Sequence, residues 1–199
     1  MLYTQTVSGE TLELLKRLMG DERLPKFRLV GGTALALQIG HRKSVDLDLF
    51  TDDSFDEQQL REYMERAYGL HTEFMDKETL KGEIKGVQID CIAHHYPWIG
   101  EAMEDDGIRL ASIEDICAMK LNAIAGNGTR IKDFIDVAYL SKQFSLRQML
   151  SFFEAKYNAN PIMAAKALTY FDDINLAEPV MMLNGKLNWK EIEKTLRRL

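Results

Sequence analysis

Two aspartates separated by a single residue have the clearest chemical potential in this sequence. Asp46 and Asp48 lie in the segment 44–50, where polar and apolar residues alternate. This period of two predicts a β-strand, on which the two carboxylates share a face roughly 6.6 Å apart. The opposite face would bury Val45, Leu47 and Leu49. Such a pair indicates a site for Mg²⁺, which one or two carboxylates and substrate phosphates commonly hold, although an isolated Asp-Leu-Asp is more often a solvated strand face.

A double glycine precedes the aspartates. Gly31, Gly32 and Thr33 stand between a strand-like run at 27–30 and a predicted helix at 33–39. Glycine lets the backbone approach a ligand closely, and free amides at a helix start attract phosphate. The segment is neither a P-loop, since no Gly-Lys-Ser/Thr follows, nor a dinucleotide fingerprint, since the third glycine is missing. A phosphate-accepting helix start followed by metal-type carboxylates is the order that a nucleoside triphosphate site needs.

A third carboxylate, Asp90, lies in the alternating segment 87–94. If this strand neighbours the strand of Asp46 and Asp48, the three carboxylates can hold two metal ions about 3.5–4 Å apart, as in-line phosphoryl displacement requires. His94 and His95 follow, but adjacent residues at a strand end point to opposite faces. We therefore expect these histidines to be exposed or to pack rather than to bind metal.

Periodicity and capping signals predict an α/β half at residues 1–107 and a helical half at 108–199. In the first half, helices are predicted at 11–19, 33–39 and 55–68, and strands at 27–30, 44–50, 71–84 and 87–94. Strand character then largely stops, and helices are predicted at 112–125, from 129, and at 145–156, 161–170 and 188–199. We expect a mixed β-sheet flanked by helices, of the α/β or α+β class, with a helical C-terminal half.

Composition narrows the class of protein without naming its chemistry. The 199 residues carry a net charge of −6, which argues against a surface coated with positive charge for nucleic acid but not against a local basic groove. No apolar run approaches the ~20 residues of a membrane helix. The first ten residues have no basic region followed by an apolar stretch, so we expect no signal peptide. Cys91 and Cys117 are too few for a disulfide framework. We expect a cytoplasmic protein without membrane contact, whose two cysteines are buried.

The motifs together resemble a known enzyme family. Residues 29–37, Arg42, Ser44 and residues 46–50 resemble the opening of the AbiEii/AbiGii-type nucleotidyltransferases, relatives of the polymerase-beta-like superfamily. Residues 113–116, 119–121 and 130–136 are similar to the family's later motifs, so that the resemblance runs from about Phe27 to Leu140. Members of this family are toxins of toxin–antitoxin and phage-defence systems, or stand-alone proteins.

The resemblance implies a nucleotidyltransferase-like fold and a role for each motif residue. Gly31, Gly32 and Thr33 would contact the triphosphate, Asp46 and Asp48 would ligate metal, and Asp90 would orient and deprotonate the attacking hydroxyl. Lys120 would neutralise phosphate charge, and Asp133 would support the nucleotide site from the helical half. Without the resemblance, Lys120 is better interpreted as a surface lysine whose stem lies along apolar neighbours.

The resemblance also implies an activity. The enzyme would move a nucleoside monophosphate from a nucleoside triphosphate to a hydroxyl acceptor, with two Mg²⁺ ions or with Mn²⁺ in their place. RNA, particularly tRNA, a protein hydroxyl and a small molecule all stay open as acceptors, and an antitoxin is an expected partner if the protein is a toxin. The alternative hypothesis is a nucleotide-binding or partner-binding module that has the fold but performs no transfer.

Overall fold

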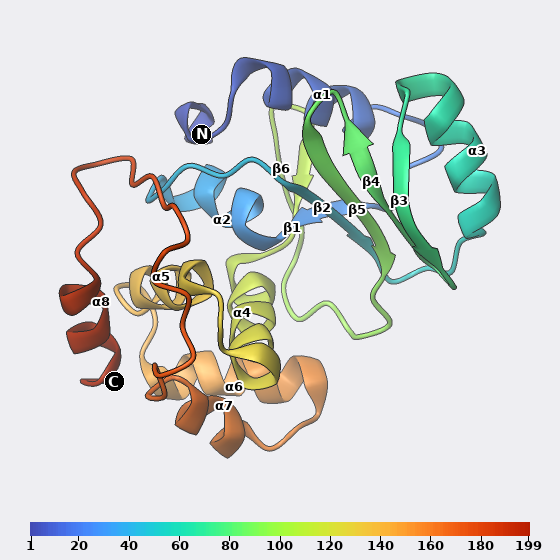
Figure 1. The fold of residues 1–199 in the computed structure, drawn as a ribbon. Helices are drawn as coiled ribbons and strands as arrows, with labels where there is room; N and C mark the ends of the chain where they lie inside the picture. Colours follow the sequence, from blue (N-terminus) through green and yellow to red (C-terminus); the bar gives the residue numbers. More distant parts are fainter.

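Seven strands form one mixed β-sheet in the computed structural model, which describes all residues from 1 to 199 (Figure 1). The strands are β1 (Arg28–Val30), β2 (Leu47–Thr51), β3 (His71–Asp76), β4 (Thr79–Ile84), β5 (Val87–Ala93), β6 (Met103–Asp105) and β7 (Ile108–Leu110). Their order is β3-β4-β5-β2-β1-β7-β6. β2 pairs in parallel with β5, and β1 with β7, whereas the remaining neighbours are antiparallel. The predicted mixed sheet flanked by helices is therefore confirmed.

Eight α-helices and one 3₁₀ helix surround the sheet and form the C-terminal half (Figure 1). They are η1 (Thr4–Thr6), α1 (Gly9–Met19), α2 (Gly31–Ile39), α3 (Glu57–Tyr68), α4 (Ile113–Asn127), α5 (Ile131–Leu140), α6 (Leu146–Tyr157), α7 (Pro161–Ala167) and α8 (Trp189–Leu196). α1 packs on β7 and α3 on β3 and β4, while α2 contacts both the sheet and α4. None of the helices has the length and apolar character that crossing a membrane requires.

Local signals in the sequence explain several helix ends. Ser112 caps α4 by accepting a hydrogen bond from the amide of Asp115, as the capping pair predicts. Gly40 ends α2 in the left-handed conformation, with φ of 65°, which glycine adopts without steric cost. Both helices contribute residues to the cavity described below.

Three expectations about the strands are wrong. Residues 71–84 are not one strand but the hairpin β3–β4, which turns where Glu78 adopts a φ of 52°. Strand character does not stop after β5, because β6 and β7 form a second hairpin and β7 pairs with β1, so that the sheet extends three residues beyond position 107. Val45 lies before β2 and is 60% exposed, whereas Leu47 and Leu49 are fully buried as predicted.

The two halves of the chain share one hydrophobic core. A single cluster of 41 buried residues includes Leu49 of the central sheet, Phe134 of α5, and both Cys91 and Cys117, which are buried and unpaired as expected. The segment that follows α7 then returns to the N-terminal half, where the amide of Lys43 donates to the carbonyl of Met181 over 2.8 Å. Figure 1 shows this segment running back past α2 before it reaches α8. The cavity between the halves is therefore bounded on several sides.

Candidate active site

A cavity of about 710 Å³ lies between the sheet and the helical half. Its N-terminal side is formed by the start of α2, the loop before β2 and the face of β2, and its C-terminal side by α4, the start of α5, the end of α6 and residues 179–181. Six of the residues predicted from sequence line it: Gly31, Gly32, Asp46, Asp48, Lys120 and Asp133. The structure thus brings together most of the predicted site, while Thr33 and Asp90 do not line the cavity.

The two glycines at the start of α2 are required by close contacts within the protein. Gly31 has a φ of 68°, and a Cβ atom there would lie 2.2 Å from Oδ2 of Asp48. A Cβ atom on Gly32 would lie 2.4 Å from Nη2 of Arg42. The helix start therefore approaches an acidic and a basic side chain more closely than any larger residue allows. No side chain caps this helix start, whose first two residues line the cavity.

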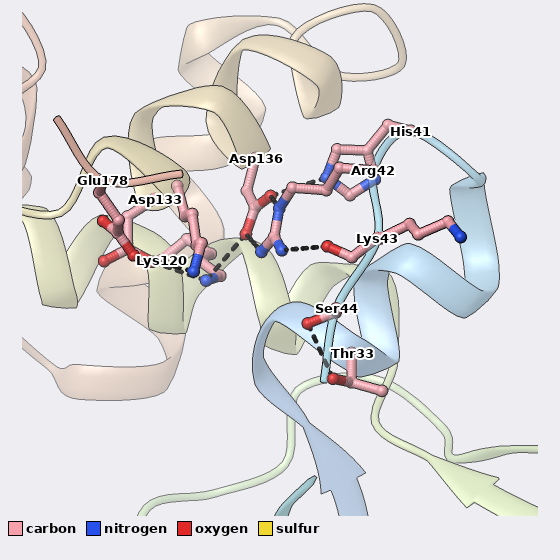
Figure 2. A network of polar contacts seen from close by, with 10 residues as sticks. Thr33, His41, Arg42, Lys43, Ser44, Lys120, Asp133, Asp136 and Glu178 are labelled. Atoms are coloured by element: carbon pink, nitrogen blue, oxygen red, sulfur yellow. Dashed lines mark hydrogen bonds and ion pairs between the residues drawn. The ribbon is translucent and has the colours of Figure 1, made fainter. Parts of the chain in front are cut away.

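Thr33 positions the loop that carries Asp46. Its side chain is buried, and its hydroxyl hydrogen-bonds to the backbone carbonyl of Asp46 and lies 2.9 Å from the hydroxyl of Ser44. Figure 2 shows Thr33 and Ser44 joining α2 to this loop. The structure therefore gives the Thr33 side chain a positioning role, in addition to the phosphate contact that the resemblance implies.

Asp46 and Asp48 both face the cavity as half-buried carboxylates. The pKa of Asp48 is raised to about 6, mainly by burial; the positive charge of Lys120 lowers it, and the negative charges of Asp90 and Asp46 add to the rise. The pair has the oxygen donors that Mg²⁺ prefers, but nowhere in the chain do three acidic, histidine or cysteine side chains come close enough to hold a metal ion. The two carboxylates therefore suit a cation whose remaining ligands come from substrate phosphates, and not a cation whose ligands all come from the protein.

Asp90 is the neighbour of Asp48 in the sheet, but its carboxylate is already engaged. The parallel pairing of β2 and β5 places Asp90 directly beside Asp48, which confirms that their strands are adjacent. Oδ2 of Asp90 forms an ion pair with Nζ of Lys81, its partner on β4. Asp48 and Asp90 therefore share one face of the sheet, whereas Asp46 lies in the loop before β2, so the prediction of both Asp46 and Asp48 on one strand is wrong for Asp46. Asp90 stays outside the lining of the cavity.

A buried ion-pair network closes the opposite wall (Figure 2). Nζ of Lys120 lies 2.6 Å from Asp133 and 2.8 Å from Asp136. Asp136 also accepts two hydrogen bonds from the guanidinium of Arg42, at 2.7 and 2.8 Å, and lies 2.7 Å from Nε2 of His41. Burial alone would raise the pKa of Asp136, but the charges of Arg42 and Lys120 hold it well below its usual range.

The network corrects one interpretation and adds residues that sequence reasoning missed. Lys120 is not a surface lysine, since it is 7% exposed and held by two carboxylates. Asp136, Arg42 and His41 were not predicted as site residues. One signal for Asp136 was present, because it follows Asp133 by three positions and such residues share a face of a helix.

The cavity also has exposed positive charge. Lys43 and Arg130 line it and are exposed, whereas Arg42, Lys120 and Lys132 are engaged in ion pairs, the last with Glu178 at 2.9 Å. Lys43 and Arg130 are therefore able to bind the negatively charged oxygens of phosphates, as exposed lysine and arginine side chains commonly do. The arrangement can therefore accept a polyanion against the start of α2 while two carboxylates face it.

Comparison with solved structures identifies the fold. MenT4, a nucleotidyltransferase toxin of Mycobacterium tuberculosis, matches with a TM-score of 0.61 at 13% identity over 94% of this chain and 80% of its own. JHP933 from Helicobacter pylori matches with a TM-score of 0.58 at 21% identity over 96% and 90%. The antibiotic-resistance factor ANT(2'')-Ia matches with a TM-score of 0.57 at 19% identity over 78% and 92%. At these identities the likeness shows the fold, which is that of the nucleotidyltransferases.

Sequence comparison identifies the family. The model of the nucleotidyl transferase AbiEii toxin of type IV toxin–antitoxin systems matches residues 13–101 and 91–199. An uncharacterised protein of Aquifex aeolicus (strain VF5) is 30% identical over 196 residues, which are 95% of this chain and 93% of the relative. The chain therefore belongs to the AbiEii nucleotidyltransferase toxin family, and it is a nucleotidyltransferase, as the motifs predicted.

Proposed function

We propose that this nucleotidyltransferase moves a nucleoside monophosphate from a nucleoside triphosphate to a hydroxyl acceptor, with Mg²⁺ as its metal. One observation carries the proposal. The start of α2 and the carboxylates of Asp46 and Asp48 face the same cavity, beside the exposed cations Lys43 and Arg130. Amides and cations that attract phosphate are thus combined with oxygen ligands for a hard metal ion.

The chain's own residues bind and orient the triphosphate. Backbone amides at Gly31 and Gly32 donate to phosphate oxygens, because the first amides of a helix have no partner within it. Lys43 and Arg130 neutralise part of the phosphate charge from the mouth of the cavity. Lys120 adds a positive charge whose place is fixed by Asp133 and Asp136, so that its position does not depend on the ligand.

Asp46 and Asp48 would hold Mg²⁺, and Mn²⁺ can take its place because it prefers the same oxygen ligands. When bound, such ions neutralise the charge that develops on the transferring phosphoryl group. A bound cation also offsets the burial of Asp48, whose pKa is raised in the protein alone. Thr33 keeps the loop of Asp46 in place beneath the site.

The proposed reaction exchanges one bond at the α-phosphorus for another and releases pyrophosphate, and the protein accepts the proton. The acceptor oxygen forms a bond to the α-phosphorus, the bond to the β-phosphate oxygen breaks, and pyrophosphate leaves with that electron pair. Asp90 takes the proton of the acceptor hydroxyl, since it lies beside Asp48 on the same face of the sheet. This role requires the ion pair of Asp90 with Lys81 to open when substrate binds.

We further propose that the acceptor is RNA and that the protein acts as the toxin of a toxin–antitoxin pair. The family, whose type IV systems pair a toxin with an antitoxin, supports both the toxin role and an antitoxin partner. MenT4, which shares the fold of this chain, is likewise a nucleotidyltransferase toxin. RNA supplies the hydroxyl acceptor, and its phosphates suit the exposed cations at the mouth of the cavity.

The transfer is tested by incubating the protein with each α-labelled nucleoside triphosphate, Mg²⁺ and total cellular RNA, protein or metabolites. We expect label in the RNA fraction, its loss with EDTA, and a drop of at least about 100-fold in Asp46→Asn and Asp48→Asn. The matched control is Asp52→Asn, the same substitution at an exposed aspartate of the same segment. Equal labelling by all three variants refutes the metal role.

Nucleotide binding without label in any fraction would favour the alternative, a binding module without transfer. The toxin role is tested separately by inducible expression. Growth should stop with the native protein and continue with Asp48→Asn expressed to the same level. Growth arrest by both proteins would show that toxicity does not depend on transfer.

A further inference from the structure

Four aromatic rings gather at the end of the cavity beyond Asp48. Phe50 follows Asp48 by two residues on β2, His94 comes directly after β5, Tyr157 ends α6, and Tyr96 follows in the loop after β5. The ring centroid of His94 lies 5.4 Å from that of Phe50, 4.8 Å from that of Tyr96 and 5.9 Å from that of Tyr157. We call these four residues the aromatic wall. Three of them line the cavity, and Tyr96, which does not, packs against both His94 and Tyr157.

The wall faces the cavity because the fold places its members there. Residues two apart on a strand share a face, so Phe50 lies on the face of Asp48 and about 6.6 Å farther along the strand. The amide of His94 donates to the carbonyl of Thr51 over 2.7 Å, which sets the imidazole beside Phe50. Tyr157 reaches the same place from the helical half. All three lining rings are only partly buried, so their surfaces are accessible to a ligand.

The imidazole of His94 is suited to contact a neutral ring. Burial, and next the charge of Lys156, lower the pKa of His94 to about 4, so the ring is uncharged at neutral pH. A neutral imidazole has one donor and one acceptor nitrogen, and Nε2 lies 3.5 Å from the hydroxyl of Tyr157. The wall therefore offers ring faces for stacking and hydrogen-bonding atoms at their edges.

We propose that the aromatic wall is the subsite that binds the nucleobase of the incoming nucleoside triphosphate. The inference rests on the proposed function, which places the phosphates between the start of α2 and Asp48. The distance from Asp48 to Phe50 along β2 leaves room for one sugar between a phosphate and a base stacked on the wall. A base of an acceptor RNA has the same chemistry, but the incoming nucleotide is favoured because the wall continues the strand that carries the metal-type carboxylates.

The test compares two ligands that differ only in the base. Isothermal titration in the presence of Mg²⁺ measures the dissociation constants of each nucleoside triphosphate and of ribose 5′-triphosphate, which has no base. A short single-stranded RNA is titrated in the same way. The variants are Tyr157→Leu and His94→Leu, which remove rings, and Tyr157→Phe, which keeps one. Tyr170→Leu is the matched control, because Tyr170 is 52% exposed and lies outside the cavity. Thermal unfolding verifies that each variant is folded.

Stacking on an aromatic side chain contributes about 1–3 kcal/mol per base, which corresponds to a change of about 5- to 150-fold in the dissociation constant. We expect Tyr157→Leu and His94→Leu to weaken binding of the preferred nucleoside triphosphate by such a factor. Binding of ribose 5′-triphosphate should change less than about twofold. Tyr157→Phe should retain most of the affinity, and Tyr170→Leu all of it.

Three results would overturn the proposal. The first is unchanged affinity for every nucleoside triphosphate in the two ring-removing variants. The second is an equal loss for both kinds of ligand, which indicates a general distortion of the cavity. The third is a loss confined to a short single-stranded RNA, which assigns the wall to the acceptor. Failure of the native protein to bind any triphosphate instead refutes the proposed function, so the two failures are distinguishable.

Discussion

Replacing Asp136 by asparagine should destabilise the protein strongly, because this carboxylate is the centre of the buried network. Asp136 is fully buried and contacts His41, Arg42 and Lys120. Asparagine has nearly the same shape, so the substitution removes a negative charge without opening a large cavity. Lys120 keeps one carboxylate partner, Asp133, while the guanidinium of Arg42 loses the only one it has in the structure.

The size of the effect follows from the unpaired charge. Breaking a buried ion pair by removing one partner typically costs about 3–5 kcal/mol, because the other charge stays buried without compensation. The two hydrogen bonds between Arg42 and Asp136 make a value in this range appropriate. Glu178→Gln is the control, because it breaks the ion pair with Lys132, in which both side chains are partly exposed. Such a pair contributes less than about 1 kcal/mol.

The assay is urea unfolding of the native protein and both variants at pH 7 and at several lower pH values. The folded-state pKa of Asp136 is held below its unfolded value, so its ionisation stabilises the protein fully above pH ~4 and progressively less as the pH falls below that value. The difference in the free energy of unfolding between the native protein and Asp136→Asn should therefore be largest at pH 7 and become smaller in acid. A loss at pH 7 no larger than that of Glu178→Gln would refute the reasoning.

Three further substitutions test other contacts by unfolding and by the labelling assay. Gly31→Ala should cost about 2 kcal/mol or more and abolish transfer, since a positive φ penalises alanine and the methyl group collides with Asp48; near-native stability would contradict this. Thr33→Val should cost about 1–3 kcal/mol and reduce transfer, because the carbonyl of Asp46 loses its hydroxyl donor; unchanged transfer would show that the loop holds its place without it. Lys156→Met should cost about 3–5 kcal/mol by leaving Asp115 buried without its cation, and a smaller loss would mean that the amides of Ile99 and Gly100 suffice.

The elements that the sequence predicted well have strong local signals. β2 shows alternation over five residues, and α4 begins at a serine whose cap is visible in the sequence. β6 and β7 were missed because three residues are too few to show a period, and their conformation depends on pairing with each other and with β1. The turn between β3 and β4 was missed because a glutamate, not a glycine, adopts the positive φ there.

The same distinction applies to the site. Gly31, Gly32, Asp46 and Asp48 occur within eighteen positions, so spacing alone indicates a shared site. The contact between Arg42 and Asp136 joins residues 94 positions apart in the sequence, and no local sequence pattern predicts a contact over such a separation. The burial of Lys120 was equally hidden, because a lysine on an apolar helix looks the same in sequence whether its ammonium reaches solvent or two carboxylates.

The network also explains why the helical half cannot be an optional addition to the sheet. Arg42 and His41 come from the N-terminal half, and their carboxylate comes from α5. Gly32 packs against the guanidinium that this carboxylate holds, so the start of α2 is indirectly fixed by Asp136. A chain ending after β7 would leave Arg42 without its partner and expose the core face that α4 and α5 cover. The geometry at the phosphate-accepting helix start therefore depends on charges supplied by the opposite half, and the cavity exists only when both halves are present.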